Sequence, residues 1–415
     1  MPLQLSDCVA LDAAADAAGP LSALRQRFAP GDLDTLYFDA NSIGPMPADA
    51  PLQVQTLLLR GWAGARRRGW AELDWLQQPR QLGAAIAPLI GAAADDVRVA
   101  DSTSINQYKL LRHALAANAP RRVIVLERDV FPSNRYVAEG IAQAGLAELR
   151  FIGDASELAA ALAPGDVAVV ALSHVDYRSS ERLDMATLTA QAHAAGALAL
   201  WDLSHSAGAL AVDLRGSDVD YALGCGYKYL CGGPGAPAFL YVRPRQAEAA
   251  WPALCGWMGH AATFDFAPDY APAAGADRFL VGTPPVLAQA AFAAAAAIWR
   301  QVDPAALTRR HRSLGDTLIR LLDEQCASLD LEIASPRAHD RRGGHVALRF
   351  PHAAALAQAL VEHGVVVSAR KPDALRLAPH PLVTTHAQLW TAVSRLRELM
   401  QRQVWNDPRY HKPTV

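Results

Sequence analysis

Short apolar runs alternate with helical segments between about residues 95 and 243. The runs lie at residues 97–100, 123–126, 149–152, 167–172, 198–201, 221–223 and 238–242. Successive strands that are joined by helices run parallel and are buried on both faces. The alternation therefore predicts an α/β fold whose large domain holds a mostly parallel, seven-stranded sheet covered by helices.

The pattern changes after a long apolar helix at residues 284–302. Predicted helices at 309–327, 353–363 and 386–405 enclose strand-like segments at 345–350 and near Val365 and Leu375. This order predicts a second, smaller α+β domain. The first fifty residues have no sheet of their own, so we expect them to join it. The predicted division is 1–50 for the N-terminal segment, 51–305 for the large domain and 306–415 for the small domain.

The composition and charge of the chain indicate which kinds of binding partner to expect. The chain has 415 residues, 51% of them hydrophobic, and a formal net charge of −2. Without a sustained basic run, we expect no nucleic acid and no membrane as main partner. The five cysteines are scattered and lack metal-ligand spacing, which predicts a reducing cytoplasm and no metal site. The first residues carry acidic groups rather than a signal-peptide pattern, and the apolar run 290–299 is too short to span a bilayer.

One lysine lies in the glycine-rich stretch GCGYKYLCGGPG, residues 224–235. Only Lys109, Lys228, Lys371 and Lys412 are lysine among 39 basic residues, so the chain otherwise uses arginine for positive charge. A lysine can lose its proton and attack a carbonyl, which a guanidinium cannot do. We therefore expect Lys228 to bind pyridoxal phosphate, although a surface lysine in a loop is the alternative.

Two further elements fit that cofactor. Asp202 stands at the carboxyl end of an apolar strand, where open α/β sheets place their ligands, and a carboxylate there keeps a pyridine nitrogen protonated. His205 follows three residues later and is expected near the ring. Ser102, Thr103 and Ser104 stand at the start of a helix, where free backbone N–H groups bind phosphate. Each element has an ordinary alternative, because Asp, Ser and Thr also cap helices.

At these residues the chain resembles the kynureninase family over nearly its whole length. The matching stretches are YFDANSIG (37–44), DSTSIN (101–106), FPSN (131–134), WDLSHSAGA (201–209), GCGYKYLCGGPGAPAF (224–239), GWMGH (256–260), GTPP (282–285) and LRLAPHPL (375–382). The resemblance implies the aspartate-aminotransferase-like fold, known as fold type I. It also implies a homodimer with a shared active site, and hydrolysis of L-kynurenine or 3-hydroxykynurenine to the anthranilate and L-alanine.

The resemblance also implies a role for individual residues. Lys228, Asp202 and Tyr227 are the expected catalytic residues, with Tyr227 as a proton donor. The remaining expected contacts are Thr103, Ser104, Tyr227, Trp257 and Thr283 to the phosphate; Phe131, Asn134, Ser173 and His205 around the ring; and Arg376, Trp70 and His260 to the substrate. Of these, Trp257 and Thr283 are expected to come from the second subunit. Arg376 is expected to bind the substrate α-carboxylate.

The chain departs from the family pattern at a few positions. Asn134 replaces an Asp, Cys231 replaces an Asn, and Asp176 and Ser179-Ser180 replace an Asn and a Thr-Gly. Ser368 and Ala369 occupy a stretch that reads Asp-Tyr or Asp-Lys in the family. These changes leave other substrates open, including another γ-oxo amino acid. Three alternatives also stay open: a cysteine desulfurase or related lyase, an aminotransferase, and a protein that binds the cofactor without turnover.

Overall fold

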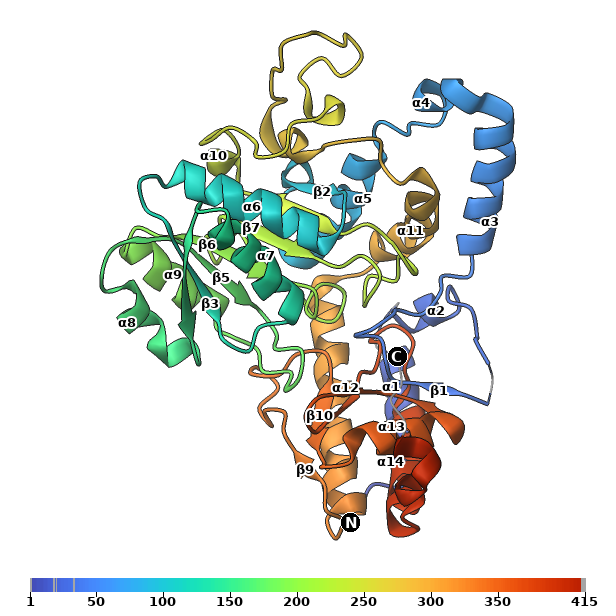
Figure 1. The fold of residues 1–415 in the computed structure, drawn as a ribbon. Helices are drawn as coiled ribbons and strands as arrows, with labels where there is room; N and C mark the ends of the chain where they lie inside the picture. Colours follow the sequence, from blue (N-terminus) through green and yellow to red (C-terminus); the bar gives the residue numbers. More distant parts are fainter. Residues whose placement is uncertain (1, 18, 20, 33, 412–415) are drawn as a thin grey trace.

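The computed structural model describes residues 2–17, 19, 21–32 and 34–411. Figure 1 shows a large α/β unit in cyan, green and yellow above a smaller unit in orange and red, which the dark blue N-terminal helix joins. The predicted α/β class and the mostly parallel sheet are confirmed. We propose domain boundaries near residues 50 and 305, since α3 begins at Ala50 and α12 at Pro304.

The large sheet has seven strands in the order β2-β8-β7-β6-β5-β3-β4. Strands β3 to β7 run parallel where they pair, whereas β8 is antiparallel to both of its neighbours. The strands are β2 (Val97–Val99), β3 (Val123–Glu127), β4 (Glu148–Ile152), β5 (Val167–Ser173), β6 (Leu198–Asp202), β7 (Tyr221–Gly224) and β8 (Phe239–Val242). Each predicted strand is present, with ends that differ by one residue at most.

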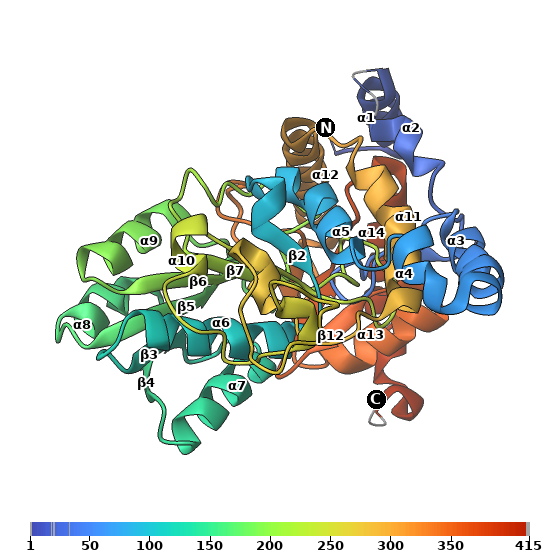
Figure 2. The same cartoon turned by 90° about the horizontal axis from the view of Figure 1, so that it is seen from above.

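Helices cover both faces of this sheet because its strands are apolar on both sides. Leu200 packs in a core with α6 and α7, while the next residue, Trp201, packs in a core with α8 and α9. Figure 2 shows the sheet edge-on between these helices. The helices of this unit are α5 (Gln78–Ile86), α6 (Thr103–Ala117), α7 (Pro132–Gln143), α8 (Leu158–Leu162), α9 (Met185–Ala194), α10 (Pro244–Ala247) and α11 (Val286–Trp299).

The smaller unit packs three helices on an antiparallel sheet of order β12-β13-β10-β9. Its elements are α12 (Pro304–Cys326), α13 (Ala353–Glu362), α14 (His386–Gln401), β9 (Glu332–Ile333), β10 (Val346–Arg349), β11 (Val365–Val366), β12 (Ser368–Arg370) and β13 (Ala374–Leu377). Helix α12 begins earlier than predicted because Asp303 caps it, accepting hydrogen bonds from two backbone N–H groups. Strands β9 and β12 were not predicted.

The N-terminal segment reaches both units. Strand β1 (Leu36–Tyr37) pairs in parallel with β11 of the smaller unit. The segment also includes α1 (Leu5–Ala17) and α2 (Leu21–Arg25). The large unit begins with α3 (Ala50–Thr56), a π-helix over Leu57–Ala65 and α4 (Gly69–Glu72). In Figure 1, α3 and α4 form an arm that projects beyond the rest of this unit. No helix in the described parts of the chain is long and apolar enough to cross a membrane.

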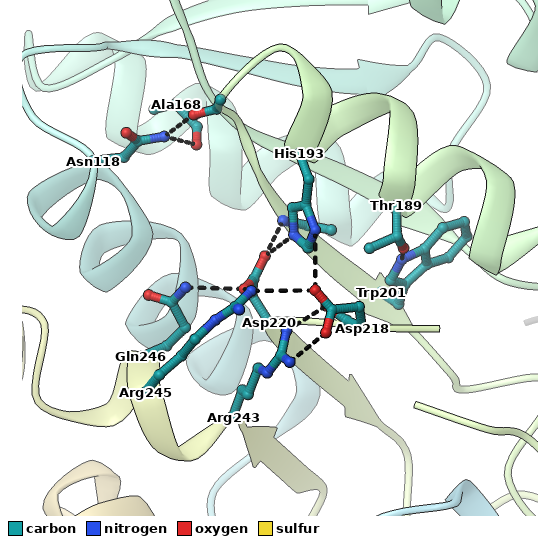
Figure 3. Close-up of polar contacts among 12 residues, drawn as sticks. Asn118, Ala168, Thr189, His193, Trp201, Asp218, Asp220, Arg243, Arg245 and Gln246 are labelled. Carbon is teal, nitrogen blue, oxygen red and sulfur yellow. Dashed lines mark hydrogen bonds and ion pairs between the residues drawn. The ribbon is translucent and has the colours of Figure 1, made fainter. Parts of the chain in front are cut away.

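The two edges of the parallel strands differ in their polar groups. At the amino ends, the buried Asp220 accepts hydrogen bonds from His193 Nε2 at 2.7 Å and from Gln246 Nε2 at 2.9 Å (Figure 3). It also accepts one from the Ala199 N–H at 2.9 Å. Arg245 lies 3.2 Å from the same carboxylate. Because protein donors surround this carboxylate, the edge is structural. The polar groups at the carboxyl ends instead face a cavity.

Candidate active site

A cavity of about 640 Å³ opens at the carboxyl ends of β5 and β6. Its walls come from the ends of these strands, the first turns of α6 and α7, and the loop that holds Lys228. The predicted residues that line it are Thr103, Ser104, Phe131, Asn134, Ser173, Asp202, His205, Tyr227 and Lys228. Parallel strands bring these segments together, because their carboxyl ends meet at one edge of the sheet.

Lys228 is buried, and its amine points toward two rings. Its Nζ lies 3.0 Å from His205 Nε2 and 5.7 Å from the centre of the Phe131 ring. Burial, with the Lys228 charge nearby, holds the pKa of His205 well below its usual value. A neutral imidazole can accept the hydrogen bond from the amine through Nε2, which leaves the proton on Nδ1. That Nδ1 is buried and has no partner among the described residues.

The Asp202 carboxylate is fixed by two donors. The Ser204 N–H donates to Oδ1 and the Asn134 amide donates to Oδ2, each at 2.8 Å. Asp202 is 8% exposed and lies on the cavity wall. An oriented carboxylate at this position can hold a proton on a ring nitrogen.

The first turn of α6 faces the same cavity. Ser102 caps the helix by accepting a hydrogen bond from the Ile105 N–H, and the next two residues are Thr103 and Ser104. Thr103 Oγ1 lies 3.2 Å from Cys225 Sγ, and that thiol donates to Ser204 Oγ at 3.3 Å. The hydroxyls and the free N–H groups of this helix start can bind an anion such as phosphate.

Tyr227 is half-buried beside the Cys225 thiol. Burial, followed by the effect of Cys225, raises the pKa of the Tyr227 phenol, so that it keeps its proton at neutral pH. Gly235 has a φ of +74° and lies on the cavity wall, where a residue without Cβ adopts this backbone easily. The loop therefore brings a protonated phenol and a flexible backbone segment to the cavity.

Arg376 does not line the cavity, although it lies behind one wall. Its guanidinium donates to the Tyr177 carbonyl oxygen at 2.8 Å, and Tyr177 is a wall residue. It also donates to Ser368 Oγ at 2.8 and 3.2 Å and to Ser42 Oγ at 3.4 Å. Burial, together with the charge of Arg370, lowers the pKa of Arg376 to about 10. In the described part of the chain no carboxylate lies within 4.0 Å of it.

Trp70, Trp257 and Thr283 line a different cavity of about 840 Å³. Trp70 packs edge-to-face against Trp257, with ring centres 5.4 Å apart. Phe264 and Phe266 complete the wall and are 49% and 72% exposed. The predicted residue His260 lies nearby in sequence but bonds to the Asp269 carbonyl and the Ala262 N–H. One copy of the chain thus keeps these residues separate from the Lys228 cavity.

Sequence reasoning missed several residues of the site. Ser204 and Cys225 link Asp202 to Thr103, and Gly44 contacts the Lys228 loop by donating its N–H to the Tyr227 carbonyl oxygen at 2.8 Å. Glu127 accepts a hydrogen bond from the Ser173 N–H at 3.0 Å. Burial raises the pKa of Glu127 to about 7. Its place at the end of β3, one strand from Ser173, was the available signal.

Comparison with known proteins finds a family profile and full-length relatives that carry the same name. A sequence profile described as the kynureninase C-terminal domain matches residues 307–396. The protein named kynureninase in Deinococcus radiodurans is 44% identical over 95% of this chain and 96% of its own length. The kynureninase of Pseudomonas fluorescens is 40% identical, with 98% and 97% covered, and that of Burkholderia mallei is 41% identical, with 96% of each covered.

Solved structures share the fold at lower identity. A mutant of the cystine C–S lyase C-DES with glycine covalently linked to its pyridoxal phosphate aligns with a TM-score of 0.77 and 21% identity, covering 90% of this chain and 99% of that one. A cysteine desulfurase from Thermococcus onnurineus aligns with a TM-score of 0.73 and 20% identity, covering 92% and 98%. These likenesses show fold type I alone. The identity to full-length relatives decides the family: the chain belongs to the kynureninases.

Proposed function

We propose that this protein is a pyridoxal-phosphate-dependent hydrolase that cleaves the Cβ–Cγ bond of L-kynurenine, or of 3-hydroxykynurenine, to release the anthranilate and L-alanine. The observation that carries the proposal is the cavity in which Lys228, Asp202 and the first turn of α6 meet. Identity of 40–44% to named kynureninases over nearly the whole chain supports the choice of substrate.

The residues of the cavity fit the cofactor. Lys228 supplies the amine for a covalent bond, Asp202 the partner for the ring nitrogen, and Thr103 with Ser104 the phosphate contacts. The partnerless Nδ1 of the buried His205 supports the same assignment, because a bound group can take the hydrogen bond that the protein leaves unmade. When bound, the cofactor stores the electrons of the broken C–H bond.

The chain's own groups then move the protons. The Lys228 amine, once free of the cofactor, takes the proton from the substrate Cα, with neutral His205 holding the amine in place. After water has added at the substrate Cγ and the Cβ–Cγ bond has broken to release the anthranilate, the Tyr227 phenol would return a proton to Cβ, and its raised pKa keeps that proton available. Ser173 and Phe131 line the walls beside these groups.

Arg376 is the proposed receptor for the substrate α-carboxylate. Its hydrogen-bond partners, the Tyr177 carbonyl and the hydroxyls of Ser42 and Ser368, are all uncharged. A planar guanidinium that makes no ion pair within 4.0 Å among the described residues can bind a substrate carboxylate with two parallel hydrogen bonds.

We further propose a homodimer in which each subunit completes the other's site. Trp70, Trp257, Thr283 and His260 are assigned to the partner's phosphate and the aromatic end of the substrate. The exposed rings of Phe264 and Phe266 beside them support an interface here, because such clustered aromatic exposure is typical of binding surfaces. The five free cysteines support a reducing, cytoplasmic location.

The alternative of a cysteine desulfurase needs an accessible cysteine near the substrate. Cys326 and Cys231 are 4% and 1% exposed, and Cys326 lies in the core of the smaller unit. Cys255 is exposed but does not line the Lys228 cavity. Cys225 does line it, but this residue is only 5% exposed and its thiol donates to Ser204 Oγ. These positions favour the hydrolase.

The test is to add L-kynurenine, and separately 3-hydroxykynurenine, to the cofactor-loaded protein while following product fluorescence and alanine. We expect an anthranilate with an equal amount of alanine, and no product from the Lys228→Ala variant. Binding of both compounds with release of neither product would contradict the proposal, and pyruvate without anthranilate would indicate an aminotransferase.

A further inference from the structure

Asn134 makes a buried hydrogen bond that the proposed chemistry has not yet used. Its amide Nδ2 lies 2.8 Å from Asp202 Oδ2, and the two residues are only 6% and 8% exposed. Because an ionised carboxylate only accepts hydrogen bonds, the NH₂ group of the amide must be the side that faces it. The amide oxygen of Asn134 has no partner in the described chain.

The position of Asn134 is itself fixed from several directions. It lies in the first turn of α7, where its N–H donates to the Phe131 carbonyl oxygen at 2.9 Å. Its own carbonyl oxygen accepts a hydrogen bond from Gln107 Nε2 of α6 at 2.9 Å, and Gln107 is 2% exposed. These two hydrogen bonds fix the backbone of Asn134, and so fix the point from which its side chain reaches Asp202.

We propose that Asn134 is a positioning residue: its amide donates to Oδ2 of Asp202 and so holds that carboxylate in the orientation that receives the ring nitrogen of the cofactor. This inference rests on the proposed function, since it assumes that pyridoxal phosphate occupies the cavity. Each carboxylate oxygen of Asp202 thus accepts one hydrogen bond, Oδ1 from the Ser204 N–H and Oδ2 from the Asn134 amide. The two hydrogen bonds together fix the plane of the carboxylate.

The choice of an amide has a chemical meaning. A carboxyl group at this position could donate to Asp202 only while it carried a proton. An amide donates at every pH. With Asn134, the hydrogen bond to Asp202 therefore forms without a proton shared between two carboxyl groups, and Asp202 is the one carboxylate of the pair.

Other titratable groups surround Asp202 and must be accounted for. Glu127 of β3 has its pKa raised by burial, with Asp202 contributing, while His205 and Lys228 line the same cavity as Asp202. Tyr227 completes the set, and Asp202 also contributes to its raised pKa. All four groups are present in the wild type and in the variants at 134. Asn134→Ala adds no titratable group, so its ratio to the wild type at each pH is the reference for the titration that Asn134→Asp adds.

The first measurement is the dissociation constant of pyridoxal phosphate from the apoprotein, followed by the absorbance of the bound cofactor. Asn134→Ala removes the donor, and we expect roughly a tenfold weaker binding, which is typical of a lost hydrogen bond to a charged group. Tyr136→Ala is the matched control, because Tyr136 is an exposed residue of the same helix, 65% accessible. Equal constants for Asn134→Ala and the wild type would overturn the proposal.

The second variant separates a hydrogen bond from a role in packing. Asn134→Asp keeps the shape, and its carboxyl group can donate to Asp202 only when one proton is shared between the two carboxyl groups. We expect its dissociation constant to match the wild type at acid pH and to become roughly tenfold weaker as the pH rises and that proton is lost. A ratio to wild type that does not change with pH would overturn the proposal.

The measurements distinguish a failure of the proposed function from a failure of the proposed role of Asn134. If the wild-type protein does not bind pyridoxal phosphate, the proposed function fails and the inference falls with it. If the wild type binds it and both variants bind it equally well at every pH, only the role of Asn134 is wrong. A melting curve for each variant shows whether it is folded, and if Asn134→Ala is not, the pH series of Asn134→Asp decides.

Discussion

Arg376 is a buried guanidinium whose position depends on hydroxyl groups. Ser368 Oγ accepts from both its Nε and its Nη2, so this serine sets the direction of the guanidinium plane. We expect Ser368→Ala to raise KM for kynurenine roughly fivefold to tenfold with a smaller change in kcat, because about one net hydrogen bond is lost in binding. Steady-state kinetics measure the split, and an unchanged KM would argue against Arg376 as the carboxylate receptor.

Gly44 is a second residue where one atom decides the local structure. A Cβ added there would lie 2.1 Å from the Lys228 carbonyl oxygen and 2.7 Å from Cys231 Sγ. The backbone of the lysine loop would have to move, so we expect Gly44→Ala to reduce cofactor content and to lower stability by about 2–4 kcal/mol. Absorbance of the bound cofactor and thermal melting measure both effects.

Gly140 supplies the control for that substitution. It lies within α7, and a Cβ added there meets nothing within 4 Å. Gly140→Ala should leave cofactor content unchanged and raise stability by about 0.5–1 kcal/mol, because alanine favours the helix. Loss of cofactor from both variants would show that the effect at Gly44 is not specific.

At the scale of elements, helix α1 is tied to the start of α14 by one carboxylate. Asp12 accepts hydrogen bonds from the backbone N–H groups of His386 and Ala387 and from His386 Nδ1, at 2.8 to 3.0 Å. Burial opposes ionisation, but these donors outweigh it and lower the pKa of Asp12. A carboxylate at a helix N-terminus also interacts favourably with the helix dipole.

We expect Asp12→Ala to lower the free energy of unfolding by about 2–4 kcal/mol, since His386 and Arg310 lose their partner. Because the folded pKa lies below the unfolded one, the contribution of Asp12 is present above the unfolded value near 4 and is lost as the pH falls through the folded pKa. Denaturation between about pH 2 and 5 measures it. Asp12→Ala should flatten this acid dependence relative to the wild type.

The strands β6 and β7 are joined at their amino ends by the Asp220 network of Figure 3. Asp220 is fully buried and accepts from His193, Ala199 and Gln246. We expect Asp220→Ala to cost about 3–5 kcal/mol, because it leaves buried donors without an acceptor. Denaturant titration measures the loss, and the folded fraction should still bind cofactor at the opposite edge of the sheet.

At the scale of the whole molecule, the proposed dimer makes a prediction that one chain cannot. Lys228→Ala and Trp257→Ala should each be nearly inactive, and they would damage different halves of a shared site. A mixed dimer of the two variants then holds one intact site, so random mixing should recover roughly a quarter of wild-type activity. No recovery after confirmed subunit exchange would mean that Trp257 acts within its own chain.

Much of the architecture could be predicted from local patterns. The β-type runs and helices from 97 to 242 predicted the sheet, and strand ends followed by polar residues led to Asp202 and the start of α6. The hydrogen bonds from Ser204 and Asn134 to Asp202, and the approach of Gly44 to the lysine loop, depend on chain segments far apart in sequence. The two- and three-residue strands β9 and β12 carry too few residues for a pattern.

The parallel pairing of β1 with β11 joins residues 36–37 to residues 365–366. During synthesis, this strand has no pairing partner until more than three hundred further residues have been made, so its backbone hydrogen bonds to a neighbouring strand form late. Gly44 contacts the lysine loop only a few residues beyond that strand. The order of translation therefore leaves the segment that leads to Gly44 without its strand partner until residue 366 has been made.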